Sequence, residues 1–332
     1  MALSPQQAHY SDKSVGDRIK KSPRWDKNEG VASTVGTIMA LLVFLSFFGI
    51  FTNQFVPVWM SDNESSHMST AIQQFATIKS SLDLAVSNYA NSLVAPAPIF
   101  VPVTLSSAGI PVFAAGTAGI LSFTPMSLTT KPIFNISYTY QSGSVVNVLS
   151  PSNDGQSGGM LDLYCPNRYF VEQHLVYENG ALILNQSDGE NIIAGPQLSI
   201  KNAGDAVNPS NVVMITYMSL YGTNVTVGGS GSKGVNADLR FASTAAYTNP
   251  SLADLTIQIV TKHGTAWYNY FDRILGQAGL VEGTHFDMDT PVLYKFNDPA
   301  FNYYTMTLVI HDVNILDYTQ ANVLMSIGEI GV

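Results

Sequence analysis

The apolar positions of the chain change their pattern as the sequence proceeds. Residues 31–61 contain no charged residue, and their centre, Ile38–Phe51, is almost wholly aliphatic and aromatic. A helix needs about 20 such residues to cross a bilayer core about 30 Å thick. The first pattern therefore predicts a membrane-spanning helix over residues 31–56.

A second pattern follows Pro57, which we expect to kink or end the membrane helix because proline lacks the donor of a helix interior. The apolar residues that follow recur at intervals of three and four positions, namely Met68, Ile72, Phe75, Ile78, Leu82, Val86 and Tyr89. This spacing places them on one face of a helix. Residues 57–95 are therefore predicted to form an amphipathic stalk helix, up to about 50 Å long, whose stripe packs against a sheet.

Residues 96–332 carry the signals of short strands between turns. Apolar and polar residues alternate, as in half-buried strands, in residues 133–138, 255–260 and 305–310. Asn179-Gly180 suits the positive-φ positions of a hairpin turn, and Asp188-Gly189 is expected to turn the chain again. The pattern predicts a mainly antiparallel head resembling a β-sandwich.

One helix is expected inside this head, because Trp267, Phe271 and Leu275 share a helical face with Ile274 and Ala278, and Gly279 follows as a C-cap. We expect this helix to cover a sheet. The Gly-rich segment 228–234 is compatible with two arrangements. It either divides the head into two lobes, near 98–227 and 235–332, or forms the tip of one long hairpin. The predicted fold class is α+β, with a membrane helix, a stalk helix and a β-rich head.

The distribution of charge sets the orientation of the membrane helix. Six basic residues precede it, Lys13, Arg18, Lys20, Lys21, Arg24 and Lys27, whereas the next basic residue is Lys79. By the positive-inside rule the N-terminus is cytoplasmic and the head is extracellular, in a single-pass protein of the cell membrane. The formal net charge of −9 argues against nucleic acid as a partner. The single cysteine, Cys165, excludes an internal disulfide.

The boundary between the basic leader and the apolar run has a recognisable form. Lys27-Asn28-Glu29-Gly30 abuts the run without a spacer, and no small-x-small cleavage site follows the run. This arrangement resembles the class III leader of archaeal type IV pilins, and Val31–Gly36 is similar to the start of many mature archaeal pilins. The resemblance implies a cytoplasmic leader over residues 1–30 that a prepilin peptidase removes between Gly30 and Val31.

The same resemblance implies partners for the mature chain: the lipid bilayer, and either other pilin-like subunits or components of the cell envelope. Bacterial pilins usually carry a glutamate as the fifth mature residue, which helps to pair subunits, and here that residue is Val35. Whether the chain enters a filament therefore stays open at this point.

Candidate chemistry is sparse in this sequence. Gly155–Gly159 fits the G-x-S-x-G nucleophile elbow, but its flanks lack the strand and helix of that elbow, so we expect a flexible loop. His285, Asp287 and Asp289 would share one strand face and are the metal candidates that the sequence offers, although solvated hairpin faces have the same pattern. We assign no catalytic residue and no cofactor.

Four asparagines begin the N-x-S/T acceptor sequence of N-glycosylation without an intervening proline: Asn63, Asn135, Asn185 and Asn224. In an extracellular head such sites would carry glycans.

These patterns support three hypotheses about function. The first is a non-enzymatic, membrane-anchored, archaeal pilin-like cell-surface protein with a structural or adhesive role. The second is an ectodomain that binds envelope polymer or glycan outside any filament. The third is an anchored surface hydrolase, which would need a buried carboxylate or histidine cluster in a cleft.

Overall fold

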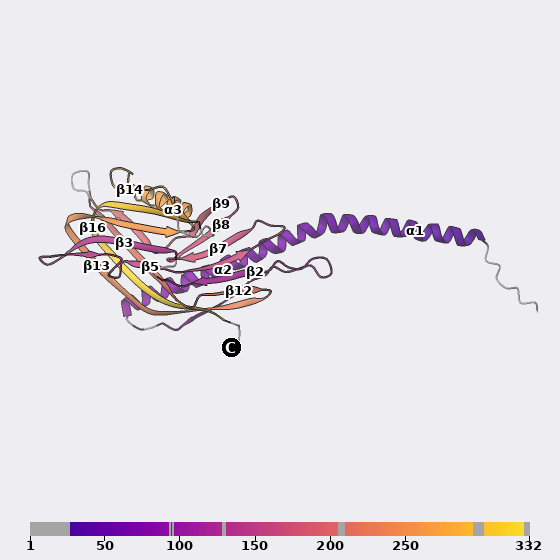
Figure 1. The fold of residues 1–332 in the computed structure, drawn as a ribbon, viewed down its shortest axis with the longest axis horizontal. Coiled ribbons are helices and arrows are strands. Elements are labelled where there is room, and N and C mark those ends of the chain that lie inside the picture. Colours follow the sequence, from indigo (N-terminus) through magenta and orange to yellow (C-terminus); the bar gives the residue numbers. More distant parts are fainter. Residues whose placement is uncertain are drawn as a thin grey trace, which may run out of the picture. The chain divides into compact units, whose positions relative to one another are not determined.

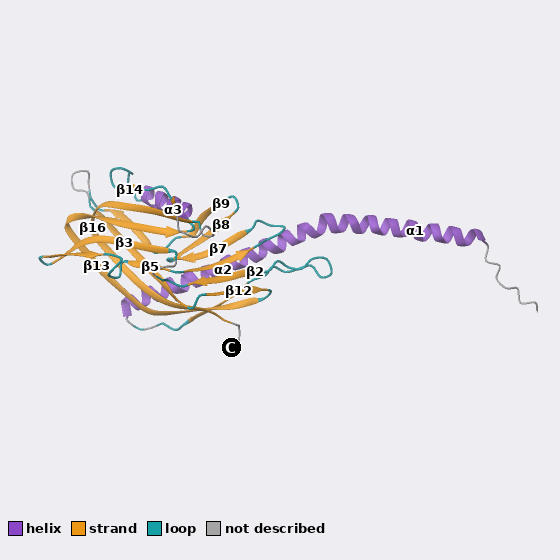
Figure 2. Cartoon of the chain, viewed as in Figure 1, coloured by secondary structure: helices purple, strands orange, loops and turns teal. Residues whose placement is uncertain are grey.

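The computed structural model describes residues 27–92, 94, 96–127, 131–204, 210–294 and 302–328, with the backbone alone for residues 27–30 and 90–92. The chain falls into two compact units, which divide between Asn53 and Gln54. Most of the predicted leader, residues 1–26, lies outside the described residues. Figures 1 and 2 show the helices and strands of both units.

The first unit contains α1 (Lys27–Ile50), an α-helix without a polar face. Every side chain from Val31 to Phe48 is exposed to solvent. A soluble helix normally hides its apolar side chains on one face, and one that is apolar all round requires an apolar surrounding. The predicted apolar helix is therefore present, and within its own unit it buries none of its large side chains.

The helical backbone does not end at Pro57. It continues from α1 through a π-helical turn, η1 (Phe51–Phe55), into α2 (Val56–Ser92). Pro57 has no backbone N–H, and its ring would collide with the carbonyl of Asn53 in a regular α-helix. The wider π turn ahead of it spares the chain this collision, so the helix does not end at Pro57, which was one of the two expected outcomes.

The second unit begins with α2, whose predicted apolar stripe is buried. Met68, Phe75, Ile78, Leu82 and Val86 are at most 2% exposed, while Ile72 and Tyr89 are partly buried beside them. They share one hydrophobic core with side chains of both β-sheets of the head. The amphipathic stalk helix is confirmed, and its partner is the interior of the head.

A six-stranded antiparallel sheet lies on one side of this core. Its strand order is β12-β2-β6-β7-β8-β9. The strands are β12 (Val225–Gly229), β2 (Gly119–Thr124), β6 (Met160–Cys165), β7 (Gln173–Glu178), β8 (Ala181–Gln186) and β9 (Gly189–Ala194).

A ten-stranded sheet completes the head, with the main order β10-β11-β16-β13-β3-β4. Its strands are β10 (Leu198–Asn202), β11 (Asn211–Gly222), β16 (Tyr303–Gly328), β13 (Ser232–Thr261), β3 (Ile133–Ser142), β4 (Val145–Leu149), β1 (Ile99–Thr104), β5 (Gln156–Gly158), β14 (Phe286–Met288) and β15 (Val292–Tyr294). Among the strand pairs of the described residues, only β11 and β16 run parallel. β13 and β16 run antiparallel along most of their length, with bulges that bend such long strands.

The head contains two hydrophobic cores, one around α2 and one around the short helix α3 (Gly264–Gln277). β7 contributes to both, because Leu175 and Tyr177 face the α2 core whereas Val176 faces the α3 core. This explains why residues 175–177 form a continuous apolar run instead of an alternating one. The prediction of a mostly antiparallel, two-sheet head with one short helix is confirmed.

Two local predictions are confirmed in detail. Asn179 and Gly180 have φ values of 44° and 76° in the turn between β7 and β8, as a type I′ turn requires. α3 ends at Gln277 with Ala278 as its C-cap, and Gly279 follows with φ 76°. The N–H of Leu280 donates to the carbonyl of Leu275 and that of Gly279 to Gly276, both at 3.0 Å, which is the Schellman arrangement.

The Gly-rich segment 228–234 connects the two sheets, because β12 belongs to the smaller sheet and β13 to the larger. The larger sheet takes strands from both sides of this segment. Residues 153–159, expected to form a flexible loop, instead include β5, which pairs with β3. The side chain of Ser157 is fully buried there, and this burial is what orders the segment.

Candidate functional site

The most prominent functional feature is the apolar part of the N-terminal helix. Among the described residues, the helix from Val31 to Tyr89 is long and apolar enough to span a membrane or to act as a signal sequence. Its most apolar stretch is not buried at all. Since about 20 apolar residues suffice to cross a bilayer, the part before Val56 is long enough by itself.

A buried carboxylate marks the start of the head. Glu64 of α2 is 0% exposed and accepts a hydrogen bond from the Thr117 hydroxyl at 2.5 Å. It also accepts hydrogen bonds from three successive backbone amides, those of Arg168, Tyr169 and Phe170, at 3.1, 2.8 and 2.7 Å. We call Glu64, Thr117 and the amides of residues 168–170 the Glu64 junction. It joins α2 to the loop before β2 and to the loop between β6 and β7.

The Glu64 junction is built to hold a negative charge. Burial alone opposes ionisation of Glu64, but the hydrogen bonds from Thr117 and the backbone amides outweigh it, so the pKa lies below its ordinary value. Consecutive backbone N–H groups form a natural anion cradle. The junction therefore fixes two loops to the first turns of the helix that emerges from the apolar segment.

Neighbouring side chains of α2 extend this attachment. Asn63 donates to the carbonyl of Ala108 at 3.1 Å, and His67 lies 2.9 Å from the carbonyl of Thr104. Gln74 accepts from the amide of Thr104 at 2.9 Å and donates to its hydroxyl at 3.1 Å. α2 is thus hydrogen-bonded to β1 and the loop after it, in addition to its apolar packing.

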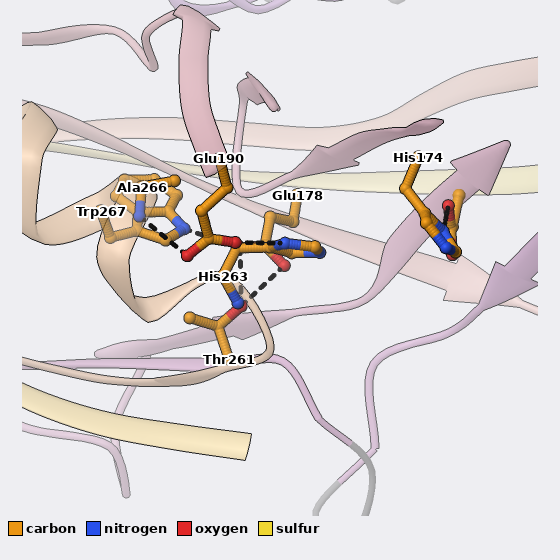
Figure 3. A network of polar contacts seen from close by, with 8 residues as sticks. His174, Glu178, Glu190, Thr261, His263, Ala266 and Trp267 are labelled. Atoms are coloured by element: carbon orange, nitrogen blue, oxygen red, sulfur yellow. Dashed lines mark hydrogen bonds and ion pairs between the residues drawn. The ribbon is translucent and has the colours of Figure 1, made fainter. Parts of the chain in front are cut away.

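A second buried polar cluster lies at the N-terminus of α3 (Figure 3). Glu178 of β7 is 0% exposed and accepts from the Trp267 indole at 2.6 Å and from the Thr261 hydroxyl at 2.8 Å. Glu190 of β9 accepts from the amide of Ala266 at 3.0 Å and lies 3.1 Å from the ring of His263. Figure 3 shows the Glu190 carboxylate between the helix end and the His263 ring.

The charges of this cluster are coupled. Burial raises the pKa of Glu178 despite the opposing effects of His263, Trp267 and Thr261. Burial alone would lower the pKa of His263, but Glu190 and Glu178 outweigh it and raise that pKa. Both shifts favour the protonated forms of Glu178 and His263.

The cluster satisfies the hydrogen-bonding needs of a helix end. His263 is the N-cap residue of α3, and Glu190 supplies the acceptor that its side chain does not. A negative charge at this end would also interact favourably with the positive, N-terminal end of the helix dipole. The hydrolase hypothesis required a buried carboxylate or histidine cluster in a cleft. The carboxylates of this cluster instead accept hydrogen bonds from the first turn of α3 and from the buried side chains of Thr261 and Trp267.

The metal candidates His285 and Asp287 have separate partners. Asp287 lies 3.0 Å from the His311 ring, whose other nitrogen is 3.1 Å from Asp254. His285 instead accepts a hydrogen bond from the amide of Val281 at 3.0 Å. Within the described ranges, no group of three or more His, Cys, Asp or Glu side chains is arranged to hold a metal ion.

The four glycosylation candidates differ in accessibility. Asn224 is exposed in the turn between β11 and β12, whereas Asn63, Asn135 and Asn185 are partly buried. Asn63 is bonded to Ala108, and the side chain of Asn135 is bonded to Gln156 at 2.9 Å. Asn224 is therefore the candidate that the fold leaves most open to a glycan.

Ser157, the centre of the G-x-S-x-G match, donates to the side-chain oxygen of Asn179 at 2.9 Å. Asn179 also accepts from the amide of Met218 at 3.0 Å, so the pair connects β5, the β7–β8 turn and β11. The Ser157 side chain is 0% exposed, and its hydroxyl donates to Asn179, so its role in this structure is to stabilise the fold. Gly30 and Val31, between which the pilin resemblance implies peptidase cleavage, lie within the helical backbone of α1.

Glu64 was missed in the sequence, although a signal was present. Met60, Glu64 and Met68 are spaced by four residues, so the acid continues the buried stripe towards the N-terminus. An acid within an apolar stripe needs buried partners. Glu178, Glu190 and His263 lie far apart in the sequence, and no local pattern predicted their meeting.

No protein-family model, no curated protein and no solved structure matches this chain.

Proposed function

We propose that this chain is a non-enzymatic, membrane-anchored, pilin-like cell-surface protein that displays its β-rich head outside the cell. The leader up to Gly30 is cytoplasmic and is removed by a prepilin peptidase, α1 is held in the lipid bilayer, and the head serves a structural or adhesive role. Other pilin-like subunits or envelope components are the partners of the head. The N-terminal end of the head, at the Glu64 junction, is the point where anchor and head are joined.

The observation that carries this proposal is the change of character within one helix. α1 exposes its apolar side chains on all sides, whereas α2 buries one stripe between the two sheets. Type IV pilins resemble this layout, with a long N-terminal helix whose outer half packs against a β-rich head. α1 supplies the apolar surface that lipid or a filament core would cover.

The head also argues against removal of α1 as an ordinary signal sequence. Val56, Met60 and Glu64 are buried in the head at 6%, 1% and 0% exposure. A signal peptidase needs an accessible, extended segment after the apolar core. Here the apolar core is followed directly by a helix that belongs to the folded head, so α1 is better suited to remain attached.

Cell fractionation tests the proposal. We expect the full chain to stay with membranes after a sodium carbonate wash, and protease added to intact cells to remove the head. Recovery of the chain in the soluble fraction, or full protection of the head in intact cells, would overturn the proposed anchoring and orientation. Sheared filaments that contain the chain would place it in a filament, and filaments without it would favour a solitary surface protein.

One observation favours the glycan-binding alternative. A shallow pocket of about 360 Å³ on the ten-stranded sheet is lined by Tyr221, Phe241, Tyr247 and Tyr318, with Asn322 among the polar groups. Phe241 is 43% exposed, and the buried side-chain oxygen of Asn322 has no hydrogen-bond partner among the described residues. Aromatic faces beside a few polar groups are typical of ligand pockets.

Titration of the full chain with soluble envelope oligosaccharides tests this alternative. We expect Phe241→Ala to weaken binding at least fivefold, while Val146→Ala, at an exposed position of β4 that does not line the pocket, has no effect. Absence of saturable binding to the unsubstituted chain would remove the alternative.

A further inference from the structure

The loop between β1 and β2 ends in an exposed apolar tip. Residues 109–115, Gly-Ile-Pro-Val-Phe-Ala-Ala, form this tip, and we call them the apolar tip. Val112 is fully exposed and Phe113 is 40% exposed. The whole stretch 84–130, in which the tip lies, contains no charged residue. Exposed apolar side chains at the end of a projecting loop are unusual on a surface that meets only water.

The apolar tip is held in a defined shape. The amide of Ile110 donates to the carbonyl of Ala114 at 2.8 Å, and the amide of Phe113 donates to the carbonyl of Ile110 at 3.1 Å. Glycine is required at its base, because a Cβ on Gly116 would lie 2.0 Å from the carbonyl oxygen of Ser107. The loop is therefore a hydrogen-bonded hairpin with a defined backbone conformation.

Val112 occupies a position that normally belongs to glycine. It has a φ of 72° in the turn from Ile110 to Phe113, with Pro111 ahead of it. Proline followed by a positive φ is the pattern of a type II turn, in which glycine or asparagine is preferred at this site. A β-branched residue here is strained. The chain thus presents an apolar side chain at the outermost point of the tip against its backbone preference.

The apolar tip lies at the N-terminal end of α2. Its base is tied to α2 by the hydrogen bond from Asn63 to Ala108 and by Thr117 at the Glu64 junction. In Figure 2 the loop is the long teal hairpin that extends beyond β2, towards the end of the head where α2 begins. Asn63 lies about 14 Å along the helix from Gln54, and the hairpin can extend about 13 Å from Ala108 to Val112.

The tip therefore reaches about as far as the first residues of the second unit, where the apolar helix ends. We infer that the apolar tip is a second membrane contact, which inserts Val112 and Phe113 into the interfacial region of the bilayer and seats the head on the lipid surface. This inference rests on the proposed function, since α1 must be in the membrane for the tip to reach it. Phe55, Val58 and Trp59 are exposed near the same end, and aromatic residues favour that interface.

Lipid suits this tip better than a polar partner does. The tip offers apolar side chains and no charge with which to pair. The tip belongs to the same chain as α1, so an anchored α1 keeps the tip near the bilayer. The effective concentration of lipid at the tip is then high, and a small apolar area suffices for contact. A second copy of the chain is the other possible cover, and the experiment distinguishes it.

Labelled cysteines test the inference in the full chain. Native Cys165 is buried, and burial together with Asp162 raises the pKa of its thiol to about 12, so it resists labelling. A bimane label would be placed on Val112→Cys and, as the matched control, on Val146→Cys of β4, which is 67% exposed. Both chains would be reconstituted into phosphatidylcholine–phosphatidylglycerol vesicles that contain lipid with a nitroxide near the headgroup.

We expect the nitroxide lipid to quench the label at position 112 at least twofold and to leave the label at position 146 unchanged. Quenching of both labels by aqueous iodide alone would overturn the inference while the anchor stands. Protection of position 112 from both lipid and iodide would mean that protein covers the tip, which also overturns it. If the chain fails to float with vesicles, the proposed anchor itself fails, and the inference fails with it.

A second pair of chains excludes insertion driven by the label. Bimane on Ala115→Cys would be compared with and without V112N and F113S. Asparagine accepts a positive φ, so the fold should be retained. We expect these substitutions to reduce lipid quenching at position 115 by at least half. Unchanged quenching would show that Val112 and Phe113 do not drive the contact, and would overturn the inference.

Discussion

The two halves of the N-terminal helix share one backbone geometry but have different surroundings. In α1 the side chain of Phe47 is 67% exposed, whereas in α2 the side chain of Phe75 is 0% exposed and lies between two sheets. The difference arises from the distribution of apolar residues: all round in α1 and in one stripe in α2. A stripe specifies a protein core, while a helix that is apolar all round needs lipid or other apolar helices.

Removal of a phenylalanine ring from each half should have very different effects. We expect Phe75→Ala to reduce the free energy of unfolding of the head by about 4 kcal/mol, because it leaves a cavity in the α2 core. Phe47→Ala should change it by less than about 0.5 kcal/mol. Urea unfolding of the full chain in detergent micelles measures both. Equal effects would contradict the division of the helix into two environments.

A charge introduced into each half should affect membrane retention in α1 and not in α2. Phe44→Arg at the centre of α1 should cost about 3 kcal/mol of membrane insertion. Ala76→Arg, on the exposed face of α2, should not affect it. The measurement is the fraction of each chain retained in membranes after a carbonate wash. Full retention of the Phe44→Arg chain would argue that α1 is not in the bilayer.

Glu64 connects α2 to two loops of the head through Thr117 and the amides of residues 168–170. Glu64→Gln should lower stability by about 2 kcal/mol, because the amide leaves buried backbone donors without a charged acceptor. Asp62→Asn, an exposed neighbour on the same helix, is the control. The low pKa of Glu64 means that its stabilisation is present above about pH 4.5 and is lost as the pH falls through the folded-state pKa. The pH dependence of unfolding below pH 5 should be flatter in Glu64→Gln, and an identical profile would contradict the role of the junction.

The smallest expected effect concerns His263 in the α3 core. Because its pKa is raised, its contribution is complete below about pH 6.5 and is lost as the pH rises through the folded-state value. Stability should therefore decline above neutral pH, by less than the effects above, and His263→Gln should flatten that decline. His174→Gln, in the more exposed pair with Asp162, is the matched substitution. Thermal unfolding from pH 6 to pH 9 tests the difference.

Much of the fold was predictable because its signals are local. The stripe from Met68 to Tyr89 and the Asn179-Gly180 turn depend on residues close in the sequence, and both are confirmed. The long strands β13 and β16 were predicted only in short pieces, since their bulges interrupt the alternation. Pro57 does not end the helix, because a π turn ahead of it accommodates the ring.

The candidate sites were less predictable, because they depend on distant residues. Glu64 meets amides more than a hundred positions away, and Glu178 meets Trp267 across the head. Only the tertiary fold brings such partners together. The apolar tip carried a local signal in its uncharged Ile-Pro-Val-Phe sequence, but its position beside α2 did not follow from that sequence.

The most direct test of the central claim is the mass of the native N-terminus of the chain purified from membranes. The proposed function predicts a mature chain that begins at Val31, with α1 still attached to the head. A chain that begins at Met1 would contradict the pilin-type processing but keep the anchor. A chain that begins after residue 50, without α1, would contradict the claim that this helix holds the head in the membrane.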